Sequence, residues 1–361
     1  MLMFVLRRLG VMVLTALALT FIVFYLTNLP PNLEKLAKSE ASMRMTDEQV
    51  ASWIEGNGFA APVISRYGQW LGVVPGWTRT MADGEERGRC IPKGSDAAAA
   101  PRFCGLLQGT WGTSTVFKKP VTDILARGLG QTGWLMLAVM LVMVPTSLIL
   151  GVLSGMREGS RTDRVLSTFA IATTATPEYV SGVIFIALFA SATTGLSPLL
   201  AEWGWIEGRT LFMGTATSAM DDITFWNFAL PVMTIALYGI GYIARMTRAS
   251  MTEVMTAQYI RTARLKGVGF AQVVLRHALR NALIAPFTVI MLQFPWLLNG
   301  VVIVETLFNY KGFGWTLVQA AGNNDIELLL GCSVVAVFVV LVTQLISDIG
   351  YVFLNPRIRL S

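Results

Sequence analysis

The residues best suited to chemistry gather in one polar stretch, Glu253 to Arg280, between two strongly apolar runs. The stretch reads EVMTAQYIRTARLKGVGFAQVVLRHALR and contains five cations and the only histidine of the chain, His277. The cations are Arg261, Arg264, Lys266, Arg276 and Arg280. Exposed cations of this kind pair with acidic surfaces, whereas a metal site needs several imidazoles, thiols or carboxylates together. The stretch therefore favours contact with a partner over catalysis.

Glu178 is a second candidate, because it is the single acid within the long apolar run 165–201. A charge inside a membrane is costly and usually faces a cavity or a partner. Such a carboxylate can attract a cationic group. Three structural roles stay open beside this one: a salt bridge, a hydrogen bond to a partner subunit, or a protonated acid.

The cysteines are Cys90, Cys104 and Cys332, and they form no CxxC motif. With one histidine in the chain, we expect no metal site built from side-chain nitrogen or sulfur. Thirteen residues separate Cys90 from Cys104. In an oxidising compartment these two can form a disulfide, and two free thiols are the alternative.

The composition indicates an all-α protein that crosses a membrane several times. Hydrophobic residues make up 54% of the 361 residues and charged residues only 14%, with a mean hydropathy of +0.58. Soluble domains carry about 25% charged residues. An apolar run follows Arg7 and Arg8, and five more runs follow further on, each long enough for a span. These five are 128–156, 165–201, 223–244, 281–304 and 328–347.

The positive charges predict the orientation of six spans. Fourteen Lys and Arg residues fall on the side of the two termini and only two in the short loops of the other side. Cytoplasmic loops are enriched in Lys and Arg, so both termini and 253–280 should be cytoplasmic. The net charge of +6 then reflects a membrane-facing side, and we expect no nucleic acid partner.

A cleaved signal peptide is the alternative for the first run, although no small-x-small cleavage site follows it.

The polar region 34–127 should then lie outside the cytoplasm. Thr46 and Gln49 predict a capping box at the start of a helix that Gly56 or Gly58 would end. Residues from Val73 to Gly105 are richer in Gly and Pro. The tryptophans of the region are either interface anchors for a partner or part of a small core or lipid boundary.

The stretch 253–280 should fold as two short helices around a glycine break. Residues 253–266 predict the first, Gly267 its left-handed end, and Phe270, Val273, Val274 and Ala278 recur at the spacing of a second, amphipathic helix. A span should begin near Asn281. On composition alone, an ordinary basic loop is an equal alternative.

The same stretch resembles the cytoplasmic loop of ABC importer permeases, in which Glu-Ala-Ala is followed by three residues and Gly. Here Arg261-Thr262-Ala263 is followed by Arg264-Leu265-Lys266 and Gly267. Arginine in place of glutamate is similar to the dipeptide/oligopeptide/nickel branch, where YxxTARxKG precedes RHALRNAL. Tyr259 and the residues 276–283 match that pattern.

Further matches extend along most of the chain. They are FVLRRLG at the start, Gln69-Trp70-Leu71, Gly109 to Ser114, Pro120-Val121, Thr176-Pro177, Glu305 to Gly314 and Asn355-Pro356-Arg357. Departures are Thr110 and Trp111 where Asp-Leu is usual, and Lys311 where proline is usual. The stretch 74–105 resembles an insertion.

The resemblance implies a permease subunit of an ATP-driven importer that moves peptides or related small solutes inward across the bacterial inner membrane. It implies a second homologous permease in a heterodimer, two ATPase subunits that use ATP and Mg, and a periplasmic solute-binding protein. The chain contains no GxxxxGK[ST] phosphate loop, so we expect no cofactor bound directly and no catalysis. Coupling to the ATPases is assigned to Tyr259, Ile260, Arg261, Thr262, Ala263, Arg264, Lys266 and Gly267.

The predicted organisation is a span at 1–33, an extracytoplasmic domain at 34–127 with an insertion at about 74–105, a five-helix core at 128–354 and a cytoplasmic tail at 355–361. The core includes the coupling loop 247–280. An intramembrane enzyme is one rival, but one histidine and a lone Glu178 provide no catalytic set. A scaffold subunit without a transport path is the other, and co-purification of ATPase subunits would distinguish it.

Overall fold

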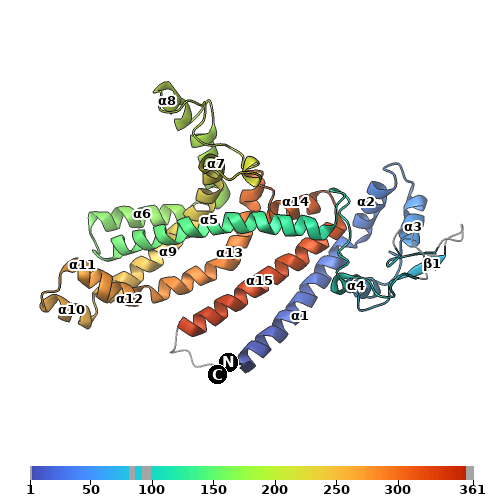
Figure 1. The fold of residues 1–361 in the computed structure, drawn as a ribbon, viewed down its shortest axis with the longest axis horizontal. Helices are drawn as coiled ribbons and strands as arrows, with labels where there is room; N and C mark the ends of the chain where they lie inside the picture. Colours follow the sequence, from blue (N-terminus) through green and yellow to red (C-terminus); the bar gives the residue numbers. More distant parts are fainter. Residues whose placement is uncertain (1, 81–85, 92–98, 355–361) are drawn as a thin grey trace. The chain divides into compact units, whose positions relative to one another are not determined.

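The computed structural model describes residues 2–80, 86–91 and 99–354. The predicted tail at 355–361 and parts of the stretch 74–105 lie outside these residues. The described chain is helical apart from one short hairpin (Figure 1). Four helices are long and apolar enough to cross a membrane, and two bent helix pairs raise the number to as many as six. The prediction of an all-α membrane protein is confirmed.

The chain forms two compact units. Among the described residues, unit 1 contains 128–315 and 340–354, and unit 2 contains 2–127 and 316–339. The predicted domain 34–127 is therefore part of a larger unit that also includes the first helix and part of the last. The physical reason is that its apolar side chains pack on those two helices.

Unit 1 holds most of α5 and the helices up to α13. Their bounds are α5 Val121–Gly155, α6 Arg161–Ala175, α7 Glu178–Phe185, α8 Leu196–Glu202, α9 Phe225–Met255, α10 Gln258–Leu265, α11 Phe270–Gln272, α12 Leu279–Ala282 and α13 Ile284–Leu307. Two π-helical segments, η3 Ile186–Ala190 and η5 Val273–Ala278, and the 3-10 turn η4 Ser218–Met220 complete the unit. Helix α14, Phe313–Gly322, begins in this unit, and α15, Ile326–Leu354, ends in it.

Helix α9 is the central helix of unit 1. In its most apolar window 78% of the residues are buried, against 28% or less in the other three long helices. Its side chains share one apolar core with α5 and α13. Because α9 is covered by its own chain, the remaining apolar faces are those left for lipid or other subunits.

Glycines allow α5, α6 and α9 to pack closely against one another. A Cβ on Gly151 of α5 would lie 2.7 Å from the carbonyl oxygen of Ala244, and one on Gly155 would lie 2.7 Å from that of Arg248. Gly241 of α9 makes the same kind of approach to Ala170 of α6, at 2.6 Å. Gly151 and Gly155 have the spacing of a small-xxx-small pair, a pattern that permits close helix contact.

Unit 2 begins with α1 Leu2–Thr27 and continues with α2 Pro30–Glu40, α3 Asp47–Gly56 and α4 Val63–Leu71. Strands β1 Thr78–Thr80 and β2 Glu86–Gly88 pair antiparallel, with Arg79 opposite Arg87. The 3-10 turn η2, Leu106–Gln108, follows. Thr46 and Gln49 form the predicted capping box, and α3 ends at Gly56 as predicted.

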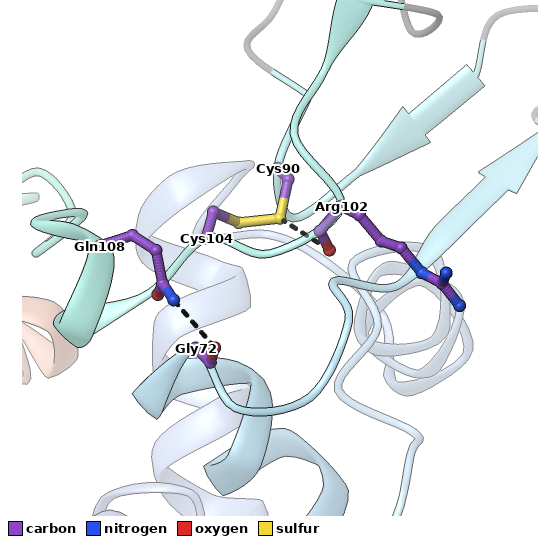
Figure 2. The surroundings of a disulfide bond; sticks show 5 residues. All are labelled: Gly72, Cys90, Arg102, Cys104 and Gln108. Atoms are coloured by element: carbon purple, nitrogen blue, oxygen red, sulfur yellow. Dashed lines mark hydrogen bonds between the residues drawn. A yellow bond between two sulfur atoms is a disulfide. The ribbon is translucent and has the colours of Figure 1, made fainter.

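A disulfide closes the hairpin region of unit 2. Figure 2 shows Cys90 bonded to Cys104, with their Cα atoms 5.5 Å apart. Beside it, Gln108 Nε2 donates a hydrogen bond to the Gly72 carbonyl at 3.0 Å. The segment after the hairpin is thus tied to the end of α4.

Candidate functional site: the basic segment between α9 and α13

The basic segment, residues 253–280, begins with a break that the sequence did not indicate. One helix was expected over 253–266, but α9 ends at Met255 and α10 begins at Gln258. Ala257 has an extended backbone, with φ −64° and ψ 148°. This turn lets Ile260 and Ala263 pack back onto the end of α9, which a continuous helix would not allow.

Helix α10 ends at a glycine, as the sequence predicted. The Gly267 N–H donates to the Arg264 carbonyl, and the Val268 N–H donates to the Ala263 carbonyl. These two bonds are those of a Schellman motif. Gly267 has φ +79°, a conformation that other residues rarely adopt, although a Cβ there would meet no atom within 4 Å. The backbone conformation, and not space, requires glycine.

The underside of α10 is apolar and buried. Ile260 is completely buried and Ala263 is 8% exposed. They share a cluster with the ends of α5 and α9 and with η5; its buried members are Met251, Ile260, Ala263, Val273, Val274, Ala278 and Ala282. Ile260 was expected to contact a partner. In the structure its side chain lies wholly beneath α10, where it packs on its own chain, and its contact with a partner stays a prediction.

The outer face of α10 is basic, with one exposed apolar side chain, Leu265, at its end (80% exposed). Arg261, Arg264 and Lys266 are exposed, as are Arg276, His277 and Arg280 further along. Tyr259 is 43% exposed, and its hydroxyl accepts a hydrogen bond from Asn281 Nδ2 at 2.9 Å. Of the predicted coupling residues, the structure therefore presents Tyr259, Arg261, Thr262, Arg264 and Lys266 to the outside.

The return path from α10 to the membrane is a helix of three pieces: α11, η5 and α12. Val273, Val274 and Ala278 are buried, as their spacing predicted. Phe270 is 38% exposed and lies under the Arg157 guanidinium, 5.1 Å from its ring centroid. The next long helix, α13, begins at Ile284 and not at Asn281. Figure 1 shows α10, α11 and α12 grouped at one end of α9.

An ion pair that the sequence analysis missed lies beside this segment. Arg248 of α9 donates from Nε and Nη2 to the two oxygens of Asp163 in α6, at 2.6 and 2.8 Å. Asp163 also accepts from the Gly159 N–H and from the Ser167 hydroxyl. Its side chain is 4% exposed. The partners are 85 positions apart in the sequence, so no local sequence pattern indicates the pair.

Glu305 holds the turn after α13. It is fully buried and accepts from Thr132 Oγ1 at 2.5 Å and from the Trp315 N–H at 2.9 Å. A Cβ on Gly314 would lie 2.6 Å from the Cα of Val302, so that glycine allows the turn to close. The carboxylate of Glu305 thus joins the end of α13 to Thr132 of α5 and to the start of α14.

Glu178 lies at a break and not in the middle of a straight span. Pro177 precedes it, and the pair of helices before and after bends by 104°. Glu178 starts α7 and is half-buried. A carboxylate is favourable at a helix N-terminus because of the helix dipole. The structure does not bring Glu178 together with the basic segment.

Within the described residues, no group of three His, Cys, Asp or Glu side chains could hold a metal ion. The basic segment has the form of a rigid patch: a short helix, fixed by its apolar underside, with cations on the free face. Such an arrangement suits recognition of another protein.

Comparisons with known proteins identify the family of the chain. Residues 147–360 match the family described as "Binding-protein-dependent transport system inner membrane component". The Di/tripeptide transport system permease protein DppB of Pseudomonas aeruginosa is 31% identical over 99% of both chains. A probable peptide ABC transporter permease protein, y4tP, of Sinorhizobium fredii is 33% identical over 70% of this chain and 77% of its own.

The glutathione transport system permease protein GsiC of Pectobacterium atrosepticum is also 33% identical, over 70% of this chain and 76% of its own. The crystal structure of an amino acid ABC transporter is similar over 64% of this chain and 94% of that one, with 15% identity and a TM-score of 0.46. The chain belongs to the binding-protein-dependent transport family. It is a membrane permease component, and the rival classes of intramembrane enzyme and scaffold are not favoured.

Proposed function

We propose that this chain is the permease subunit of an ATP-driven importer that moves peptides or related small solutes inward. The basic segment is the place where separate ATPase subunits act on it. The supporting observation is the form of α10, which has a buried apolar underside, an exposed basic face and a left-handed glycine at its end. A short helix fixed in this way moves as a unit, so it transmits a push to α9 and α13.

The proposed assembly contains a second, homologous permease as a heterodimer partner, two ATPase subunits and a periplasmic solute-binding protein. The ATPase subunits bind and use ATP and Mg, and this chain binds no cofactor directly. The chain spans the bacterial inner membrane with both termini in the cytoplasm. Three relatives of this chain are named as permeases for peptides or glutathione, which supports peptides as the cargo class.

The test uses substitutions at Gly267. Gly267→Val forces a β-branched residue into φ +79°, so it should distort the end of α10 and abolish substrate-stimulated ATP turnover in the assembled transporter. Gly267→Asn is the matched control, because asparagine tolerates this conformation. We expect it to retain most of the turnover.

Both variants should insert into the membrane at normal levels, since a Cβ at this position meets nothing. Normal coupling in Gly267→Val would contradict the proposal. Loss of membrane insertion is checked separately by fractionation, which distinguishes a coupling defect from a folding defect.

We also propose that Glu178 faces the transport path, where its carboxylate attracts cationic groups of the cargo. Glu178 is half-buried, and the described residues offer it no hydrogen bond or ion pair. Glu178→Gln should lower the transport of cationic peptides relative to neutral ones. An unchanged ratio would show that the residue has no role in selectivity.

A further inference from the structure

A cavity of about 290 Å³ lies in unit 2, bounded by the ends of α1 and α15 and by the region 34–127. Five aromatic side chains contribute to its wall: Phe24, Trp53, Phe59, Trp70 and Trp77. Trp53 and Phe59 are stacked, with ring centroids 5.7 Å apart. None of the lining residues belongs to the basic segment 253–280, so the cavity is a separate feature of the molecule.

Arg66 of α4 is the buried cation of this cavity, with 8% of its surface exposed. Its Nη1 donates to Asn28 Oδ1 at 2.9 Å, and its Cζ lies 5.9 Å from the centroid of the Phe59 ring. Its Nε is buried and has no hydrogen-bond partner among the described residues. Within the described chain, no carboxylate lies within salt-bridge distance of it, and burial lowers the pKa of its guanidinium.

A buried cation without an anion is costly, and such groups are normally paired. The Nε atom is too buried to reach a ligand, but the terminal nitrogen Nη2 has no hydrogen bond among the described residues and is not among the fully buried atoms, so it is the donor that Arg66 offers to the cavity. The position therefore suits a carboxylate that arrives from outside the chain, because a carboxylate can accept two hydrogen bonds from one guanidinium.

Glu327, in the first turn of α15, is the opposite charge in the same cavity. Gly112 leaves room for it, since a Cβ there would lie 2.7 Å from Glu327 Oε2. The carboxylate of Glu327 has no hydrogen bond or ion pair among the described residues. Arg89 and Glu40 also line the cavity, and Asp325 is a further acid near Glu327. Glu327 thus keeps free acceptors for a donor cation.

We propose that this cavity binds a small zwitterion with a free carboxylate and a free ammonium group, the chemistry of amino acids and short peptides. The carboxylate would pair with Arg66, the ammonium with Glu327, and an apolar side chain would lie against the aromatic rings. The volume is at the lower limit for small-molecule sites, so the ligand is one or two residues long. This rests on the proposed import of peptides and deepens it, because it assigns a site for such solutes to the permease itself.

The test is a titration of the full-length chain in lipid nanodiscs with the dipeptide Ala-Phe, followed by tryptophan fluorescence and calorimetry. Trp53, Trp70 and Trp77 line the cavity, so binding should change the fluorescence. N-acetyl-Ala-Phe lacks the ammonium group, and Ala-Phe amide lacks the carboxylate. Each blocked peptide should bind about tenfold more weakly or worse, the usual effect of losing a hydrogen bond to a charged group.

Two variants assign the two ends of the ligand. Arg66→Gln should bind Ala-Phe and its amide equally, and Glu327→Gln should bind Ala-Phe and its N-acetyl form equally. Arg79→Gln is the matched control, because Arg79 pairs with Glu55 in the same unit and lies outside the cavity wall. It should keep both preferences.

The proposal is overturned if the native chain shows no saturable binding, or if blocked and free dipeptides bind equally. If Arg66→Gln does not fold, Glu327→Gln alone decides the outcome by its effect on the acetylated peptide. These measurements use no ATP and no partner subunit, so their failure would leave the Gly267 test of coupling untouched.

Discussion

The basic segment 253–280 and the cavity of unit 2 both present positive charge, but they hold it in opposite ways. In the segment, Arg261, Arg264 and Lys266 are exposed over an apolar underside. In the cavity, Arg66 is buried beside aromatic rings. An exposed cation is solvated and costs nothing when it has no partner, whereas a buried one needs an anion. The difference indicates a large protein partner for the segment and a small charged ligand for the cavity.

The pair of Asp163 and Arg248 shows a third solution, in which a buried charge finds its partner within the chain. It links α6 to α9 next to the basic segment. In the three cases a charge is exposed, buried with a partner in the chain, or buried without one. Substitutions at these places should therefore differ in their effect on stability.

Asp163→Ala should have the largest effect. It leaves the Arg248 guanidinium without its carboxylate; because that guanidinium is 30% exposed and partly solvated, the cost should lie near the lower end of the roughly 3–5 kcal/mol that breaking a fully buried pair costs. The unfolding midpoint of the chain in nanodiscs should fall accordingly. The double variant Asp163→Ala/Arg248→Ala should recover part of the loss, because no orphan charge remains. A midpoint equal to that of the native chain would show that the pair is not buried as described.

Loss of the disulfide should have the next largest effect. The bond closes a loop of about 15 residues, for which chain entropy gives about 3 kcal/mol. Cys90→Ser/Cys104→Ser should lower the stability of unit 2 and increase hydrogen exchange at Trp77 and Arg89, while exchange at α10 stays the same. Mass analysis provides the check, since alkylation of both cysteines without reductant would exclude the bond.

Removing the exposed cations should have the smallest effect on stability. The triple substitution Arg261→Gln/Arg264→Gln/Lys266→Gln should change the free energy of unfolding by about 0.5 kcal/mol or less for each residue, as surface substitutions usually do. It should nevertheless reduce co-purification of the ATPase subunits and its dependence on salt. Substituting Arg209, which lies outside the basic segment, is the control. A large fall in stability would mean that these cations have partners inside the chain. It would contradict the distinction between the exposed cations of the segment and the buried Arg66.

Features that depend on neighbours in sequence were predictable. The capping box of Thr46 and Gln49, the end of α10 at Gly267 and the buried positions Val273, Val274 and Ala278 each follow from a local pattern. The apolar runs likewise fixed the all-helical membrane class, because a span needs only length and hydrophobicity. Orientation remains a prediction from the distribution of charge.

What the tertiary structure decided is which side chains meet across long separations. Ile260 and Tyr259 are adjacent in sequence, yet one is buried in the cluster beneath α10 and the other bonds to Asn281. Asp163 meets Arg248, and Arg66 shares a cavity with Glu327, only because helices far apart in the chain pack together. The sequence by itself determined the spans, the caps and the basic character of 253–280. Whether each charge is solvated, paired within the chain or buried without a partner depends on burial, and burial is a property of the packed helices.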